Sequence, residues 1–140
     1  IFNTYGPNMN SDDGRVVSNF INQAITNKPI TIYGDGKQTR SFCFVDDLIE
    51  GINAYLNLKD KFLGPINLGN PEEFDMNELA KKVIKLTNSS SEIIYEDLPQ
   101  NDPLKRKPDI TLATKKLNFS PKVNIDNGLN ETISYFKKIK

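Results

Sequence analysis

The chain alternates short strand-like runs with amphipathic helical segments, and this alternation constrains its fold more than any other feature. Apolar side chains recur at i, i+3 and i+4 between positions 15 and 27, the spacing of one helix face. Pro29 ends this helix, and the β-branched run at 30–33 is typical of a strand. The pattern predicts an α/β or α+β domain. Further strands are predicted at 1–3, 40–45, 64–70 and 92–96, and further helices at 46–56, 75–84, 110–117 and 126–138.

Helix starts are also marked in the sequence. Asp46 or Asp47 is expected to cap the helix at 46–56, whose apolar face includes Tyr55. Asp75 stands three residues before Glu78, the spacing of a capping box. These signals predict well-defined helix starts next to the predicted strands.

Composition limits the chemistry that this chain can perform. Its 140 residues suffice for one domain with a core, and Lys plus Arg equals Asp plus Glu at 18 each. That balance argues against a nucleic-acid or anionic-membrane partner. Histidine is absent, so the chain contains no Ser-His-Asp triad, no Cys-His pair and no histidine-based zinc site, and we expect no metal. The single cysteine, Cys43, excludes an internal disulfide and is expected to be a small buried side chain.

The stretch "GDGKQTRSF" (34–42) is the first candidate site. Gly34 and Gly36 predict a tight turn, because glycine adopts positive φ without steric penalty. Gln38 then stands at the exit of the turn, and Arg40 just inside a strand predicted to be half-buried. An arginine held by regular backbone suits bidentate binding of phosphate or carboxylate. The alternative is a solvent-exposed arginine in a hairpin.

A second candidate cluster surrounds "FNTYGP" and "DGR". Asn3 and Thr4 are expected at the carboxyl end of a strand, where open α/β sheets bind ligands. Arg15 is expected in the first turn of its helix, with Ser18, Asn19 and free backbone N–H groups nearby, an arrangement that stabilises an anion. The alternative is that the polar side chains here only shape a turn or cap the helix.

The third cluster is "KRKPD", in a proline-rich segment at 97–109 that is predicted to be a loop. Its alternative is a solvated charged surface. Arg106 nevertheless lies close to Pro108, which restricts the backbone. If the fold brings Arg15, Arg40 and Arg106 together, they form an anion clamp suited to a diphosphate.

The order of these motifs carries a family resemblance. "FNTYGP", "DGRVVSNFI", "TIYGDGKQTRSFCFVDDL", "PINLGNPEEF" and "DPLKRKPDI" together resemble the C-terminal half of the UDP-glucuronic acid decarboxylases, which are extended short-chain dehydrogenase/reductases. The resemblance implies an α/β, Rossmann-type fold of which residues 1–140 form the C-terminal nucleotide-sugar-binding portion. It also implies that the N-terminal NAD-binding half lies outside this chain, together with the glycine-rich loop and the catalytic Tyr-x-x-x-Lys helix. The chain alone is then expected to be inactive.

The chemistry implied by the resemblance is decarboxylation with NAD as cofactor. In the family, NAD⁺ oxidises the 4-hydroxyl of UDP-glucuronate, carbon dioxide leaves, and hydride return gives UDP-xylose. The implied partner is the UDP-sugar, with a homodimer formed through the missing half. The expected location is the cytoplasm, or the Golgi lumen if a membrane anchor precedes the chain.

The resemblance also implies roles for individual residues. Arg40 would bind the diphosphate, and Thr4 and Arg15 would lie where substrate and nicotinamide meet. Arg106 is implied as the catalytic residue that faces the sugar carboxylate or the enolate, and its high pKa favours an electrostatic role over proton donation. The substrate-binding residues implied are Asn3, Arg15, Ser18, Asn19, Tyr33, Gln38, Arg40 and Arg106.

Three alternatives stay open at this point. The first is another NAD-dependent enzyme of the group, such as a 4-epimerase or a 4,6-dehydratase, and the second is a non-catalytic nucleotide-sugar-binding module. A truncated remnant that folds poorly is the third. Tyr33 with Lys37 and Tyr55 with Lys59 share the Tyr-x-x-x-Lys spacing. We expect neither pair to be catalytic, because the first spans the glycine turn and Tyr55 is expected in the core.

Overall fold

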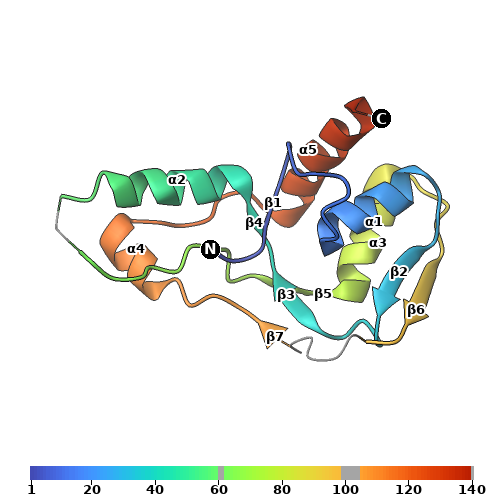
Figure 1. Ribbon diagram of the computed structural model, residues 1–140, viewed down its shortest axis with the longest axis horizontal. Coiled ribbons are helices and arrows are strands. Elements are labelled where there is room, and N and C mark those ends of the chain that lie inside the picture. The colour runs from blue at the N-terminus through green and yellow to red at the C-terminus, as the bar shows by residue number, and fades with distance from the viewer. Residues whose placement is uncertain (60–61, 99–104, 140) are drawn as a thin grey trace.

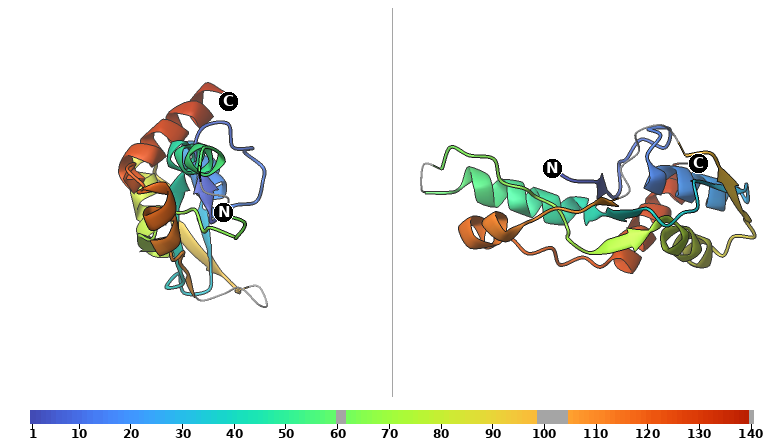
Figure 2. Two further views of the ribbon diagram at one scale, coloured as in Figure 1. Left: turned by 90° about the vertical axis from the view of Figure 1, so that its left-hand side faces the viewer. Right: turned by 90° about the horizontal axis from the view of Figure 1, so that it is seen from below.

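The computed structural model describes residues 1–59, 62–98 and 105–139, and the molecule is elongated (Figures 1 and 2). Helices α2 and α4 occupy one end, and α1 and α3 lie beside β2 and β6 toward the opposite end, with α5 nearer the middle (Figure 1). In chain order the elements are β1 (Thr4–Tyr5), α1 (Val16–Ile25), β2 (Ile30–Tyr33), β3 (Thr39–Ser41), β4 (Cys43–Phe44), α2 (Val45–Leu56), β5 (Glu73–Asp75), α3 (Met76–Thr87), β6 (Ile93–Glu96), β7 (Lys105–Arg106), α4 (Thr111–Leu117) and α5 (Ile125–Lys138).

In the part of the chain that the structure describes, the strands form three small sheets. β1 pairs with β4 and β2 pairs with β6, both in parallel. The third sheet has the order β5-β3-β7, in which the central strand β3 is antiparallel to β5 and parallel to β7. In this sheet Arg40 is the register partner of Phe74 on one side and of Arg106 on the other.

Two apolar cores hold these elements together. The larger core packs α1, α3 and α5 around β2 and includes Phe42 and Phe44. The smaller core joins α2 to α4 and includes Cys43. Residues 42–44 are therefore buried on both faces, because successive side chains enter different cores. The expectation of a half-buried strand at 40–45 is wrong, and the segment is divided into β3 and β4 at Phe42.

Local sequence explains several helix starts. α3 begins with the predicted capping box: the Asp75 carboxylate accepts from the Glu78 N–H at 2.7 Å, and the Glu78 carboxylate accepts from the Asp75 N–H at 3.1 Å. The cap predicted for α2 is wrong, because β4 runs directly into α2 and Phe44 takes the N-cap position. Asp47 is instead buried and accepts from the backbone N–H groups of Lys122 and Val123, both at 3.0 Å.

Gly51 in the middle of α2 has a packing reason. A Cβ atom at this position would lie 2.9 Å from side-chain atoms of both Leu68 and Phe119. The missing side chain therefore lets α2 approach the segments that carry the smaller core, and this offsets the low helix propensity of glycine.

Other predicted elements are shifted, missing or different in type in the structure. The first strand lies at Thr4–Tyr5 instead of 1–3, because the backbone pairs with β4 there. The strand predicted at 64–70 does not form; Leu68 accepts one backbone bond, from the Phe2 N–H at 3.0 Å. The described part of the predicted loop at 97–109 contains β7. Helices α1, α3, α4 and α5 and strands β2 and β6 confirm the predictions within a few residues at their ends.

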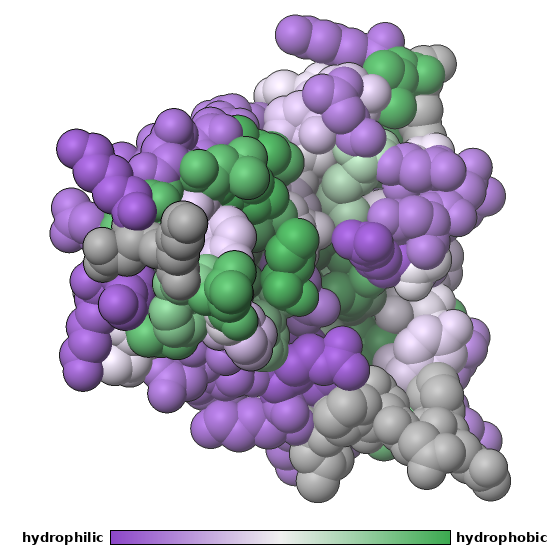
Figure 3. Space-filling view, turned by 60° about the vertical axis from the view of Figure 1, so that its left-hand side comes forward, coloured by the Kyte–Doolittle hydropathy of each residue, from purple (hydrophilic) through white to green (hydrophobic). Residues whose placement is uncertain are grey.

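Apolar side chains remain exposed at the end of the molecule formed by α2 and α4 (Figure 3). Leu56 is 73% exposed and Leu63 is 98% exposed. Tyr55, which was expected in the core, is 39% exposed on the same helix. Within the described ranges, no helix combines the length and apolarity needed to cross a bilayer.

Candidate functional site

An open cavity of about 440 Å³ lies where β1, β3 and β7 meet the start of α1. Met9, Val17 and Phe42 contribute apolar side chains to its wall. Its polar lining comes from segments far apart in the sequence and consists of Asn3, Thr4, Arg15, Arg40 and Arg106. The fold therefore brings the three predicted arginines to one cavity.

Arg40 is fixed by the sheet. It is only 8% exposed, and its Nη1 donates to the carbonyl of Thr39 at 2.8 Å. Because Arg106 is its register partner in the parallel pair of β3 and β7, both side chains project from the same face of the sheet. Two arginines on one face of the sheet make this wall of the cavity attractive to an anion.

Asn3 and Thr4 enter the cavity at the start of β1. Both were expected at the carboxyl end of a strand, and this is wrong because Thr4 is the first residue of β1. The Asn3 carbonyl accepts from the Cys43 N–H at 2.8 Å, and its Nδ2 donates to the Ser41 carbonyl at 3.3 Å. Thr4 Oγ1 donates to the Phe2 carbonyl at 2.9 Å. These bonds fix the position of both residues relative to β3 and β4.

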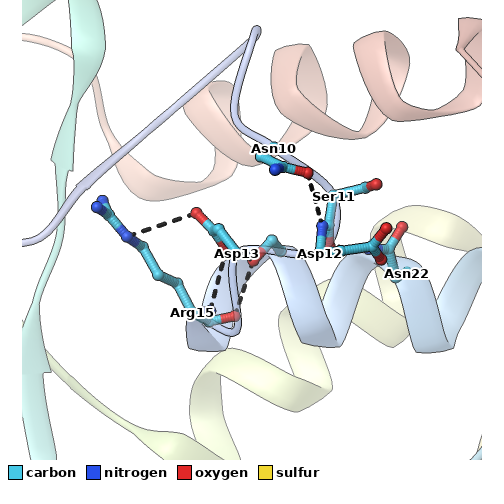
Figure 4. A network of polar contacts seen from close by, with 7 residues as sticks. Asn10, Ser11, Asp12, Asp13, Arg15 and Asn22 are labelled. Carbon is cyan, nitrogen blue, oxygen red and sulfur yellow. Dashed lines mark hydrogen bonds and ion pairs between the residues drawn. The ribbon is translucent and has the colours of Figure 1, made fainter.

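Arg15 is the N-cap residue of α1, one position before the predicted first turn, because its backbone is extended there. Its N–H donates to Asp13 Oδ1 at 3.0 Å, and its Nε lies 3.4 Å from Asp13 Oδ2. Figure 4 shows the Asp13 carboxylate contacting both the backbone and the side chain of Arg15. Asp13 thus orients a side chain that is 65% exposed and available to a ligand.

The loop that precedes α1 is held by further polar bonds (Figure 4). Asn10 Oδ1 accepts from the Asp12 N–H at 3.0 Å, and the amide of Asn22 on α1 donates to the Ser11 carbonyl. The turn-shaping role considered for this region is therefore real, and it coexists with the placement of Arg15 in the cavity.

Four predicted substrate-binding residues are not part of this cavity lining. Ser18 is fully buried and donates to the Asp13 carboxylate, and Asn19 lies on α1. Gln38 is also buried, and its Nε2 donates to the Tyr33 carbonyl at 2.7 Å across the glycine turn. The Tyr33 side chain is 45% exposed. The roles of these four residues in binding substrate stay predictions.

Glu73 on β5 is a polar residue near the site that the sequence did not single out. Its Oε1 accepts from Thr39 Oγ1 at 2.8 Å, and its Oε2 lies 3.3 Å from both Lys105 Nζ and Lys107 Nζ. The hydrogen bond from Thr39, with further contributions from the two lysines, lowers the pKa of the Glu73 carboxyl below its ordinary value. In a strand at 105–107, Lys105 and Lys107 project from one face and Arg106 from the other. The "KRK" pattern would therefore have indicated this arrangement if the segment had been predicted to be a strand.

Comparison with known proteins shows which sequences this chain resembles. Residues 1–69 match the NAD dependent epimerase/dehydratase family. The chain is 51% identical to UDP-glucuronic acid decarboxylase 1 of Arabidopsis thaliana over 137 residues, which is 98% of this chain and 31% of the relative. It is 46% identical to UDP-glucuronic acid decarboxylase 1 of Xenopus tropicalis over 138 residues, 99% of this chain and 32% of the relative. The chain thus spans about a third of the length of these relatives.

The fold is shared with a solved enzyme structure. UDP-glucuronic acid 4-epimerase from Bacillus cereus, solved in complex with UDP-glucuronic acid and NAD, superposes with a TM-score of 0.92 and 31% identity. The match covers 99% of this chain and 44% of that structure. The fold therefore matches the corresponding part of a Rossmann-type epimerase structure, as the motif order predicted.

Proposed function

We propose that this chain, which is related to the NAD-dependent epimerase/dehydratase family, is the nucleotide-sugar-binding part of a UDP-glucuronate decarboxylase. The complete protein would convert UDP-glucuronate to UDP-xylose and carbon dioxide. Support comes from the 51% identity to a plant UDP-glucuronic acid decarboxylase over nearly the whole chain. The same activity was expected from the motif order alone.

One structural observation carries the proposal. Arg15, Arg40 and Arg106 come from three separate segments and line one cavity together with Asn3 and Thr4. UDP-glucuronate bears a diphosphate and a sugar carboxylate, both of which guanidinium groups bind with paired hydrogen bonds. A cavity of about 440 Å³ is in the range of small-molecule sites.

Arg40 suits the diphosphate because its backbone and side chain are already ordered before a ligand arrives. It is 8% exposed and bonded to Thr39, so little rotamer freedom remains to be lost on binding. Arg15 reaches the same cavity from the N-terminus of α1, where the helix dipole adds to its attraction for an anion. The two arginines would hold opposite sides of one anionic group.

Arg106 suits the sugar carboxylate and the charge that follows decarboxylation. Once the 4-hydroxyl has been oxidised to a ketone, loss of carbon dioxide moves an electron pair toward the ketone oxygen as an enolate. Arginine keeps its proton at any physiological pH, so Arg106 would stabilise this negative charge without donating the proton itself. A water molecule or another group would then supply the proton to carbon.

When bound, NAD supplies reversible hydride transfer at the sugar 4-position. The described residues fit a contact with one edge of this cofactor. Thr4 and Arg15 line the cavity, but β4 and β5 run directly into α2 and α3 without the glycine-rich loop that holds a dinucleotide pyrophosphate. We therefore propose that most of the NAD site lies in the remainder of a longer protein.

The exposed apolar residues of α2 support a longer protein. Ile49, Tyr55 and Leu56 present apolar area to solvent on this helix, and Figure 3 shows apolar surface at this end of the molecule. Such clustering is typical of a surface that another part of the protein covers. On this basis we expect another part of the complete protein to cover this helix.

Product analysis of the complete protein tests the proposal. Incubation with NAD and UDP-glucuronate is expected to release carbon dioxide and to give UDP-xylose, whereas residues 1–140 alone are expected to release none. The second candidate is a UDP-glucuronate 4-epimerase, favoured by the shared fold with the Bacillus cereus enzyme. Formation of a UDP-hexuronic acid without carbon dioxide would select that candidate and contradict decarboxylation.

A further inference from the structure

The sheet β5-β3-β7 separates its charges between two faces. Arg40 and Arg106 are register partners and line the cavity on one face. Side chains alternate along each strand, so the neighbours Thr39, Lys105 and Glu73 project from the opposite face. The two faces of this small sheet thus carry different polar groups.

Glu73 spans the sheet on that opposite face. It belongs to β5, whereas Lys105 belongs to β7, and β3 lies between the two strands. Strands separated by one neighbour lie about 10 Å apart, so the side chains must meet over the central strand. The side chains meet over Thr39, whose Oγ1 donates to Glu73 Oε1 at 2.8 Å. Lys105 Nζ and Lys107 Nζ each lie 3.3 Å from Glu73 Oε2.

Within the described ranges, the strand that carries Arg106 has few other fixed contacts. β7 contains two residues, both exposed, and pairs with β3 along one edge. The Ser41 hydroxyl donates to the Arg106 carbonyl at 3.1 Å. Glu73 contacts the side chains of the residues before and after Arg106, namely Lys105 and Lys107.

We propose that Glu73 is a positioning residue for Arg106: it binds Lys105 and Lys107 on the far face of the sheet and so holds the Arg106 guanidinium toward the substrate cavity. The Glu73 side chain is 18% exposed, whereas the lysines are 66% and 47% exposed, so the carboxylate is the ordered partner of the three. Glu73 lies outside the cavity lining and acts through the backbone of β7. The inference rests on the proposed function for its kinetic readout.

Steady-state kinetics of the complete protein test the proposal with Glu73→Gln, Arg106→Ala and the double variant. Glu73→Gln is expected to lower kcat for carbon dioxide release by roughly ten- to a hundredfold, the loss expected from a small misplacement of a catalytic group. The Kd for UDP is expected to stay within about twofold, because the diphosphate arginines are untouched. In the Arg106→Ala background, Glu73→Gln is expected to add no further loss.

Two results of the kinetic test would overturn the proposal. One is a wild-type kcat in Glu73→Gln, and the other is losses of kcat that multiply in the double variant. Glu50→Gln is the matched control, because Glu50 on α2 forms a 2.7 Å ion pair with Lys122, and both residues are outside the cavity lining. The kcat of this variant is expected to equal that of wild type. If Glu73→Gln does not fold, Lys105→Gln/Lys107→Gln removes the same contacts from exposed positions and is expected to lower kcat equally.

Hydrogen exchange separates this proposal from the proposed function. The amides of 105–107 are expected to exchange faster in Glu73→Gln than in wild type, whether or not the protein decarboxylates its substrate. Unchanged exchange would overturn the positioning role by itself. An inactive wild-type protein with faster exchange in the variant would instead reject the proposed function and leave the positioning of β7 supported.

Discussion

Arg40 and Arg106 are register partners in the parallel pair of β3 and β7, and both line one cavity. The pairing places two arginine side chains from distant parts of the sequence on one face of a sheet. Arg15 reaches the same cavity from the start of α1. The candidate site is thus determined by strand register as much as by residue type.

Substitution of Arg40 tests the binding half of the site. Arg40→Ala in the complete protein is expected to weaken UDP-sugar binding by about 1–3 kcal/mol, because a charge-assisted contact to the diphosphate is lost. Titration calorimetry measures the change, and Lys81→Ala on the exposed side of α3 is the control. Circular dichroism of the variant is needed as a folding check, because Arg40 is buried. Unchanged affinity in a folded variant would remove Arg40 from the diphosphate site.

Substitution of Arg106 tests the catalytic half. Arg106→Ala is expected to depress turnover of UDP-glucuronate much more than affinity for UDP, since the guanidinium is assigned to the carboxylate and the enolate. The measurement is kcat for carbon dioxide release beside the Kd for UDP. Because Arg106 is exposed, stability is expected to change little. Equal losses in both quantities would assign Arg106 to simple binding.

Cys43 gives a prediction for pH dependence. Burial, with a smaller contribution from the Asp47 carboxylate, raises the pKa of the Cys43 thiol to about 12. The unfolded thiol titrates near 8.5, so the unfolded state loses its proton first as the pH rises. The stability contributed by this group is therefore complete below about pH 8.5 and is lost above it, by up to about 1.4 kcal/mol per pH unit.

Two measurements check the Cys43 prediction. A thiol reagent at pH 8 is expected to react with the unfolded chain and to leave the folded chain unmodified, because Cys43 is 1% exposed. Urea unfolding between pH 8 and pH 10 is expected to show a steeper loss of stability in wild type than in Cys43→Ala. Rapid modification of the folded chain would contradict the burial of this thiol.

The capping box of α3 predicts a stability effect remote from the cavity. Asp75→Ala is expected to lower the free energy of unfolding by about 1 kcal/mol, because the Glu78 N–H loses its acceptor. Urea denaturation measures this change. Glu131→Ala, at an exposed position inside α5, is expected to stay within about 0.5 kcal/mol of wild type. An equal effect of both substitutions would show that the cap itself contributes nothing.

Local sequence patterns predicted the helices and the residue types of the site. The periodicity of Val17, Phe20 and Ile21 fixed the buried face of α1, and the Asp75–Glu78 spacing marked the start of α3. Arg40 was correctly placed just inside a strand after the glycine turn. These features depend on neighbours within a few positions, so the sequence displays them directly.

The remaining features depend on pairing between distant segments. β7 consists of two cations and has no strand signal of its own, so its register with Arg40 and its contact with Glu73 were not predicted. The hydrogen bond from the Gln38 amide to the Tyr33 carbonyl within the turn was not predicted either, and the role of Gln38 in binding substrate stays a prediction. Tyr55 follows the apolar period of α2 but is exposed, because periodicity identifies an apolar face without showing what covers it.

A crystal structure of the complete protein with UDP-glucuronate and NAD tests the central claim most directly. We expect the diphosphate oxygens within hydrogen-bonding distance of Arg40 and Arg15, and the sugar carboxylate within hydrogen-bonding distance of Arg106, in the cavity beside Asn3 and Thr4. A UDP-sugar bound elsewhere, with the three guanidinium groups contacting only solvent or protein, would contradict the claim.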